Sequence, residues 1–150
     1  MEHKLMEWKA AGAAVISVIG AVLGWRGILV LTWVALMGLD YLTGSLAAIK
    51  NGEWSSARAR EGIWHKAGAL LVTAVAGITD GMMLVLCGHI PVLDMEWPEL
   101  LLPMVLAWYI LTELGSILEN AVHLGANPPG WLVKALEAGK KAVEDAGEQK

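Results

Sequence analysis

Four long blocks of apolar residues, separated by short polar segments, dominate the chain. They cover residues 10–24, 27–49, 67–93 and 100–118. A helix needs about 20 residues to cross the hydrocarbon core of a bilayer, within a range of roughly 17–25. Three blocks reach that length, and the first does so only if Trp8 and Trp25 count as its interfacial ends. We therefore expect an all-α integral membrane protein with four transmembrane helices, or three if the first block is interfacial or re-entrant.

The composition opposes the alternative, a soluble protein with a large buried helical core. Hydrophobic residues make up 56% of the chain and charged residues 17%, whereas soluble domains average about 45–50% and about 25%. Too few polar residues remain to cover a soluble domain of this size. Rings of tryptophan gather at membrane interfaces, and five lie near the block edges: Trp8, Trp25, Trp54, Trp64 and Trp97. Trp33 and Trp108 lie inside blocks, where we expect them to pack between helices.

The distribution of lysine and arginine predicts an orientation. The segment 50–66 carries four basic residues and the tail after residue 120 carries four more, whereas residues 94–99 carry none. Basic residues favour the cytoplasmic side of a membrane. Four spans with both termini in the cytoplasm fit this pattern, and with three spans the head would lie outside. We expect a transmembrane domain over residues 1–120 and a cytoplasmic tail over 121–150.

Three carboxylates lie inside the apolar blocks: Asp40 in the second, Asp80 in the third and Glu113 in the fourth. Each costs roughly 2.5–3.5 kcal/mol at the centre of a membrane helix on insertion scales, so such groups face other helices or water. Two hypotheses stay open. The acids either make interhelical hydrogen bonds as protonated carboxyls, or they line or gate an aqueous path. Thr43 follows Asp40 by three residues on one helix face, and we expect it to be a local partner.

Small residues recur at the spacing of membrane helix contacts. Gly20 and Gly24 form one GxxxG pattern, Gly77 and Gly81 form another, and Gly44-Ser-Leu-Ala-Ala48 is similar. Such faces let helix backbones approach closely in lipid. Asp80 lies inside the second pattern, so a contact face would carry an acid. The contacts belong either to packing within one chain or to an interface between copies.

The polar segment after the second block reads as a short, structured connection. Asn51-Gly52 is a turn signal, and Ser55 or Ser56 is expected to cap a helix beginning near Ala57. The basic residues beyond it are expected to be ordinary cytoplasmic charges, with binding of anionic headgroups as the alternative.

The tail changes character after residue 120. The stretch GANPPG (125–130) breaks the helix, and a short amphipathic C-terminal helix follows, with Leu132, Leu136 and Val143 on one face. This helix either lies on the membrane surface or packs on the polar connection, and the sequence does not choose between them.

Enzyme and nucleic-acid functions find no support. The chain contains no GxSxG, HExxH, P-loop or dinucleotide motif. Its four histidines are scattered and Cys87 is its single cysteine, so we expect no catalytic, cofactor or metal site. The basic residues lie beside membrane spans, which argues against nucleic acid as a partner.

Two stretches resemble the phage holin family that includes holins associated with toxin secretion. The first is DYLTGSLAAIKNGEWSS (40–56) followed by GIWHKAG (62–68), and the second is ELGSILENAVHLG (113–125) followed by NPPGWL (127–132). The resemblance extends from about residue 30 to 136. It implies a non-enzymatic protein of the bacterial inner membrane that assembles into homo-oligomeric lesions at a set time. An endolysin or a toxin would leave through them as cargo, without specific binding.

The resemblance and the contact patterns together nominate residues for the pore or for assembly. They are Asp40, Thr43, Gly44, Lys66, Gly77, Asp80, Gly81, Glu113, Ser116 and Asn120. We hypothesise that one copy hides its acids in a helix bundle and that glycine faces let copies cluster. Rearrangement in the cluster would then turn the acids toward water.

Two rival functions share many of these features. An antiholin that regulates another holin would carry the same motifs without being lethal. A small proton-coupled multidrug exporter also has four spans and a membrane carboxylate. Such exporters usually place that acid in their first span, and residues 10–24 contain none.

Overall fold

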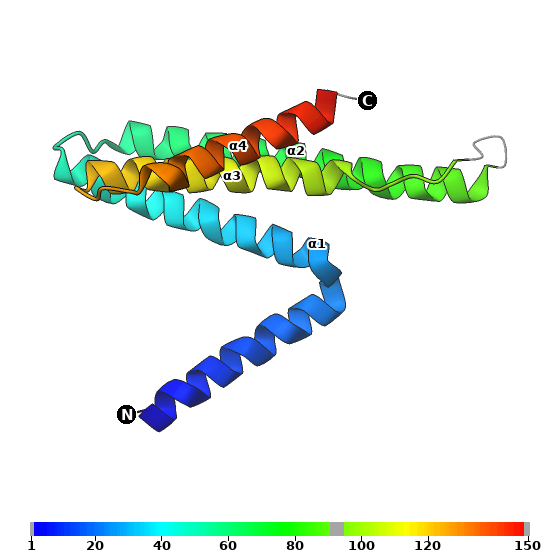
Figure 1. Cartoon of the computed structure of the whole chain (residues 1–150), viewed down its shortest axis with the longest axis horizontal. Coiled ribbons are helices and arrows are strands. Elements are labelled where there is room, and N and C mark those ends of the chain that lie inside the picture. Colours follow the sequence, from blue (N-terminus) through cyan, green and yellow to red (C-terminus); the bar gives the residue numbers. More distant parts are fainter. Residues whose placement is uncertain (1, 91–94, 149–150) are drawn as a thin grey trace.

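The computed structural model describes the backbone of residues 2–90 and 95–148, and the side chains of Met6, of residues 24–90 and of residues 95–148. This part of the chain contains four helices and no strand. They are α1 (Glu2–Lys50), α2 (Ser56–His89), α3 (Leu101–His123) and α4 (Gly130–Glu148) (Figure 1). The all-helical class predicted from the sequence is confirmed.

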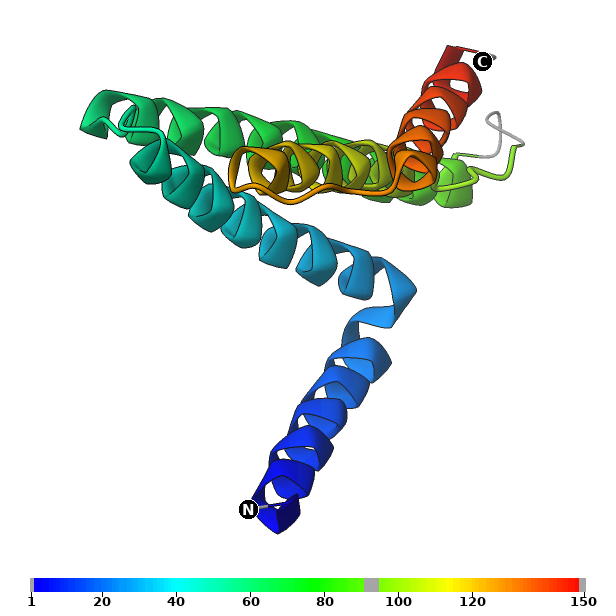
Figure 2. The ribbon, with the colours of Figure 1, turned by 60° about the vertical axis from the view of Figure 1, so that its left-hand side comes forward.

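Helix α1 is broken at Gly24, where the ribbon changes direction sharply (Figures 1 and 2). Gly24 has φ 64° and ψ −172°, a conformation that glycine adopts without a steric penalty. Among the described residues no other side chain lies within 4 Å of the position a Gly24 side chain would take, and Gly24 provides the bend between the two parts of α1. The first predicted span, residues 10–24, otherwise lies outside the described side chains and stays a prediction.

Three helices in the described part are long and apolar enough to cross a membrane. They are Gly24–Lys50, Ser56–His89 and Leu101–His123, with mean hydropathies of 1.5, 2.0 and 1.7. These spans contain most of the predicted blocks 27–49, 67–93 and 100–118. The protein is therefore a multi-pass membrane protein, as its composition predicted.

Helix α2 begins at Ser56, next to the start predicted near Ala57, and the apolar block predicted from residue 67 follows within the same helix. The hydroxyl of Ser55 accepts a hydrogen bond from the Arg58 backbone N–H at 3.2 Å, which caps the helix as predicted. Most of the polar segment 50–66 is thus helical. A helix of 34 residues spans about 51 Å, so it extends beyond a hydrocarbon core of about 30 Å.

Helix α3 is central and contacts α1, α2 and α4. Trp33, Met37 and Leu106 form the buried core, with exposed fractions of 1%, 7% and 0%. The Trp33 ring stacks on Tyr109 with 5.4 Å between ring centroids. The predicted packing role of Trp33 is confirmed, and this layer joins α1 to α3.

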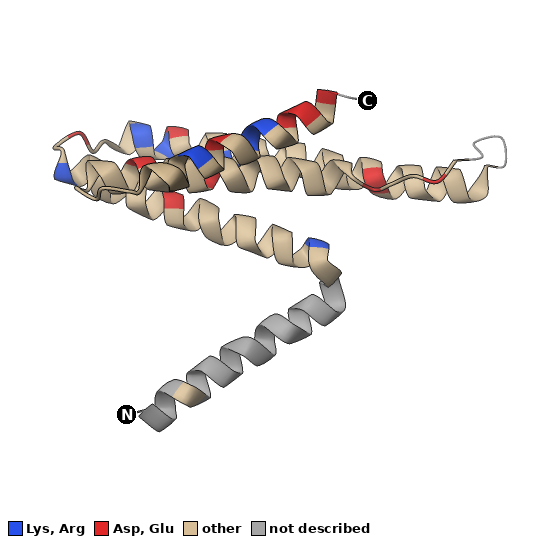
Figure 3. Cartoon of the chain, viewed as in Figure 1, with Lys and Arg blue, Asp and Glu red and all other residues tan. Residues whose placement is uncertain are grey.

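The outer surface of the spans is apolar. Helix α2 exposes Leu71, Val75 and Ile78 by more than 60% each, whereas Asp80 and Glu113 are buried. Figure 3 shows long uncharged stretches along the spans, with charges gathered on α4 and near the 51–55 turn. Exposed apolar area of this extent marks a surface that contacts lipid or protein. The acids face inward, as predicted for membrane helices.

Helix α4 packs against α3, which it crosses obliquely in Figure 1. A side chain at Gly139 would lie 3.3 Å from Leu111, so the two helices approach closely there. The Lys140 ammonium lies 5.0 Å from the centroid of the Trp108 ring, within the range of a cation–π contact. The tail helix thus lies along α3, an arrangement that neither sequence-based alternative included.

Candidate functional site

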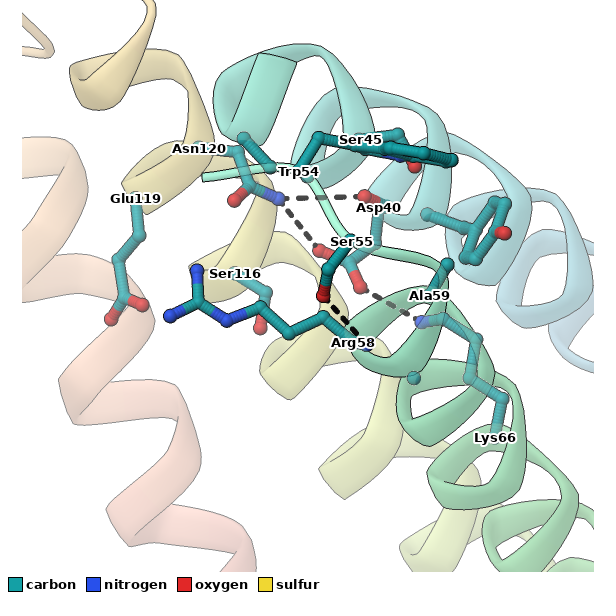
Figure 4. Close-up of a pocket in the computed structure, with 14 residues that line it drawn as sticks. Asp40, Ser45, Trp54, Ser55, Arg58, Ala59, Lys66, Ser116, Glu119 and Asn120 are labelled. Atoms are coloured by element: carbon teal, nitrogen blue, oxygen red, sulfur yellow. Dashed lines mark hydrogen bonds and ion pairs between the residues drawn. The ribbon is translucent and has the colours of Figure 1, made fainter. Parts of the chain in front are cut away.

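One lysine joins two of the buried acids across three helices. Lys66 Nζ on α2 lies 2.8 Å from Asp40 Oδ2 on α1 and 2.7 Å from Glu113 Oε2 on α3. Asn120 on α3 completes the group, since its Nδ2 donates to Asp40 Oδ1 at 3.0 Å. We call Asp40, Lys66, Glu113 and Asn120 the ion cluster. Figure 4 shows Lys66 and Asn120 both pointing at the Asp40 carboxylate.

The three charged members lie at the same level of the bundle. Asp40 precedes the end of α1 at Lys50 by ten residues, and Glu113 precedes the end of α3 at His123 by ten. Lys66 follows the start of α2 at Ser56 by ten residues. Ten helical residues rise about 15 Å, which is half of a hydrocarbon core of about 30 Å. Because α2 carries the exposed Arg58, Arg60 and Glu61 within this distance, its start lies outside the hydrocarbon core, and the ion cluster lies closer to the end of the bundle at the 51–55 turn than to the middle of the membrane.

Two small residues, Gly44 and Thr43, lie where Asn120 of α3 approaches α1. A side chain at Gly44 would lie 3.4 Å from the Asn120 amide, so Gly44 lets Asn120 approach α1. Asn120 Nδ2 also lies 3.2 Å from Thr43 Oγ1. The Thr43 hydroxyl donates to the backbone carbonyl of Leu39 at 2.9 Å. The same hydroxyl lies 3.1 Å from the Asp40 backbone carbonyl, so Thr43 is a local partner of Asp40 through the backbone and not through the carboxylate.

The pairing explains how charges are tolerated at this depth. The side chains of Lys66, Asp40 and Glu113 are only 20%, 19% and 10% exposed. Buried charges are stable when they are paired and hydrogen-bonded, and removing one partner is strongly destabilising. Lys66 is thus an inward-facing partner of both acids, and its interpretation as an ordinary cytoplasmic charge was wrong. The interhelical contacts of Asp40 and Glu113 are made to the Lys66 ammonium and, for Asp40, also to the Asn120 amide.

A cavity of about 420 Å³ lies beside the ion cluster and includes Asp40, Lys66 and Asn120 in its wall. Residues from α1, α2, α3 and the 51–55 turn line it (Figure 4). Much of the lining is small or hydroxylated, with Gly44, Ser45, Ala48, Ala59, Gly62 and Ser116. Ser116, a predicted site residue, therefore faces the same space as the ion cluster.

Asp80 forms a second, separate polar site. Its Oδ2 accepts from the Leu102 backbone N–H at 2.9 Å and its Oδ1 from the Leu101 N–H at 3.3 Å. The indole N–H of Trp97 donates to Oδ1 at 2.9 Å. A carboxylate at a helix N-terminus satisfies free amides and interacts favourably with the helix dipole. Asp80 of α2 therefore caps α3, a role that its position in the sequence did not reveal.

The two glycines around Asp80, Gly77 and Gly81, differ in their surroundings. A side chain at Gly77 would lie 3.7 Å from Leu102, so Gly77 faces α3 of its own chain. At Gly81 no side chain from the described part of the chain would meet an added Cβ. An ion pair between Arg26 and Glu99 ties the start of the first described span to the residues before α3. Any role of Gly77 and Gly81 between copies stays a prediction.

No metal site emerges from the residues described. Among them, no group of three or more His, Cys, Asp and Glu side chains is placed to hold an ion. The arrangement instead offers structural chemistry: a charged network inside the bundle, a polar cavity beside it and a fixed helix cap.

The bacteriophage holin family matches residues 17–141, which contain the ion cluster, Asp80 and most of α4. The chain belongs to this family. The match begins before residue 30 and ends after residue 136, so it extends the resemblance seen in the sequence. This holin is also 30% identical over 132 residues to an uncharacterized protein of Halalkalibacterium halodurans, covering 88% of this chain and 91% of the relative.

Two Listeria relatives match a shorter part of the holin. Uncharacterized proteins of Listeria innocua and Listeria monocytogenes are 34% and 33% identical over 113 residues, covering 75% of this chain and 72% of each relative. No solved structure matches the chain.

Proposed function

We propose that this holin oligomerises in the bacterial cytoplasmic membrane and forms lesions that release an endolysin, or a toxin, from the cytoplasm. The observation that carries the proposal is the ion cluster, which holds charged groups at one level of three membrane helices. Ionisable residues at such depth mark functional positions by default. Membership of the holin family supplies the class of function.

A single copy has the properties of a stable membrane monomer. Its buried charges pair inside the bundle, and the outer surface of its three spans is largely apolar, whereas α4 and the start of α2 carry exposed charges. Exposing the ion cluster to water would replace protein partners by solvent without leaving a charge unpaired in lipid. Clustering of copies would allow this exposure, because helices of a neighbouring copy can replace the helix contacts within one chain. In this mechanism Asp40, Lys66 and Glu113 become part of the wall of the lesion.

The proposed lesion needs no catalytic group and no specific cargo contact. We assign the end that carries Lys50, the 51–55 turn and the start of α2 to the cytoplasm, because its basic residues follow the orientation rule for membrane loops. The tail from residue 121 onward then begins on the cytoplasmic side. A co-expressed antiholin, as a regulator of assembly, is the protein partner that this proposal includes.

Expression in a bacterium, with and without a co-expressed cell-wall hydrolase, tests the function. Abrupt growth arrest with entry of a membrane-impermeant dye, followed by lysis when the hydrolase is present, supports a holin. Delay of lysis by another holin would identify an antiholin, and drug tolerance would identify an exporter. A purified protein that stays monomeric in bilayers at high density, and never leaks solute, would contradict the proposal.

A further inference from the structure

The ion cluster carries an unbalanced formal charge. Two carboxylates share one ammonium, which leaves one negative charge without a basic partner in the cluster. Arg58 lines the cavity but already pairs with Glu53 at 2.9 Å. A charge left unpaired in a membrane span is costly, and such groups usually pair or contact water-filled space. The cavity is the part of the molecule that can supply that water.

The dimensions and lining of the cavity suit water. One water takes about 30 Å³ in the liquid and needs two to four polar partners, so about 420 Å³ corresponds to roughly 14 waters. Ser45, Ser116 and Asn120 supply polar groups along the wall, and Asp40 and Lys66 form part of it. Trp54 and Arg58 lie where the 51–55 turn meets the start of α2, which places the opening at that end (Figure 4).

The bundle is dry on the other side of the ion cluster. Met37 lies one helical turn from Asp40 and Trp33 two turns, and Leu106 faces them from α3. The side chains of these three residues are almost fully buried. Their single polar group is the Trp33 indole N–H, which has no hydrogen-bond partner among the described residues. One donor is too little to hold a water there.

We propose that the cavity is a water-filled vestibule through which water and small cations reach the ion cluster from the end of the bundle at the 51–55 turn, and that the layer of Trp33, Met37 and Leu106 closes it. The negative charge of the cluster makes a cation the ion that enters. The vestibule is a property of one copy and does not depend on lesion formation.

Accessibility of single cysteines to a membrane-impermeant thiol reagent tests the vestibule in the full-length chain. Cys87→Ser provides the background, and three variants are compared. Ser116→Cys places the thiol in the vestibule wall, Leu42→Cys on the outer face, where Leu42 is 61% exposed, and Met37→Cys in the dry layer. Ser116 and Leu42 lie seven and eight residues from the ends of their helices, or about 10–12 Å, so their depths match.

We expect Ser116→Cys to react at least about tenfold faster than Leu42→Cys, because the reacting thiolate forms in water and not in lipid. Met37→Cys should stay unreacted. Reaction of Ser116→Cys should occur from one membrane face only, as compared in right-side-out and inverted vesicles at low protein density. If the reaction rate followed side-chain exposure alone, Leu42→Cys would react faster than Ser116→Cys, because Leu42 is the more exposed side chain.

The charge of the reagent provides a second readout. A cationic reagent should outpace an anionic one at Ser116→Cys by more than at Asn127→Cys, which lies exposed in the loop before α4. Asp40→Asn in the Ser116→Cys variant should reduce that preference. Failure of both predictions would overturn the entry of cations into the vestibule.

Three results would overturn the proposal. They are an unreactive Ser116→Cys in protein that elutes as a single folded species, equal reaction at Leu42→Cys, and reaction of Ser116→Cys from both faces. Lysis assays on the parent chain are independent of these rates, so a failed vestibule and a failed holin function are distinguishable.

Discussion

The ion cluster and the Asp80 site accommodate the same type of residue in two different ways. Asp40 and Glu113 share the ammonium of Lys66, so their stability depends on three helices staying together. Asp80 accepts backbone N–H groups of α3 and the Trp97 indole, so it needs only its neighbour helix and no basic side chain. In the proposed mechanism, water or another copy can replace the ion pairs of the first site. The second fixes where α3 begins, and we therefore regard the ion cluster as the functional element and Asp80 as its scaffold.

The largest expected effect comes from removing the shared cation. Lys66→Met leaves two carboxylates facing each other without a counter-charge, and we expect a loss of about 3–5 kcal/mol in the free energy of unfolding. Unfolding in detergent, followed by circular dichroism, measures it. Arg60→Met on the exposed side of α2 is the matched control and should stay within about 0.5 kcal/mol. Equal effects would show that the ion cluster contributes no stability.

Removal of the cap should have a smaller effect. Asp80→Ala leaves three N–H donors without acceptors, those of Trp97, Leu101 and Leu102, and we expect about 2–3 kcal/mol of destabilisation. Asp80→Asn keeps an acceptor oxygen and should cost about 1–2 kcal/mol. The same unfolding measurement applies. If Asp80→Asn were as damaging as Lys66→Met, the two sites would not differ in kind.

Lysis timing separates scaffold from assembly. Asp80→Asn and Gly77→Leu are each expected to change the lysis schedule, the second because a larger side chain meets Leu102 of α3. Growth curves after induction, with matched membrane levels of each variant, provide the measurement. If both variants lyse cells on the parent schedule, the hypothesis that acid and glycine faces drive assembly is wrong, even for a functional holin.

A double-mutant cycle tests the unbalanced charge. Asp40→Asn or Glu113→Gln alone leaves one carboxylate for Lys66, so each should cost less than about 1.5 kcal/mol. The double variant leaves Lys66 without a carboxylate, and its loss should exceed the sum by about 1–2 kcal/mol. Additive losses in detergent unfolding would mean that the two acids do not share the lysine.

The smallest expected effect concerns the polar edge of the ion cluster. Asn120→Ala removes the donor to Asp40 and should cost about 1 kcal/mol. Glu119→Gln, on the adjacent exposed position, serves as its control and should be nearly neutral. A neutral Asn120→Ala would show that water replaces the amide.

Local features of this holin were predictable because they depend on neighbours in the chain. Block length and hydropathy predicted three of the membrane helices, and the Ser55 cap follows from one short sequence pattern. The inward direction of Asp80 and Glu113 was predictable because lipid penalises charge wherever a helix packs. The sequence predicted the start of α2 near Ala57 but ended the fourth block at residue 118, whereas α3 extends to His123. The equal distance of Asp40, Lys66 and Glu113 from their helix ends could therefore not be read from the sequence.

The sequence by itself determined that apolar helices cross a membrane and that their acids need shelter, because hydropathy and desolvation act on each segment separately. Only the tertiary structure decided which group shelters which acid. Lys66 meets partners 26 and 47 residues away, and Asp80 meets amides 21 and 22 residues further on. Such contacts depend on the register and rotation of the packed helices. Hydropathy alone does not distinguish the observed helix pairing from many others.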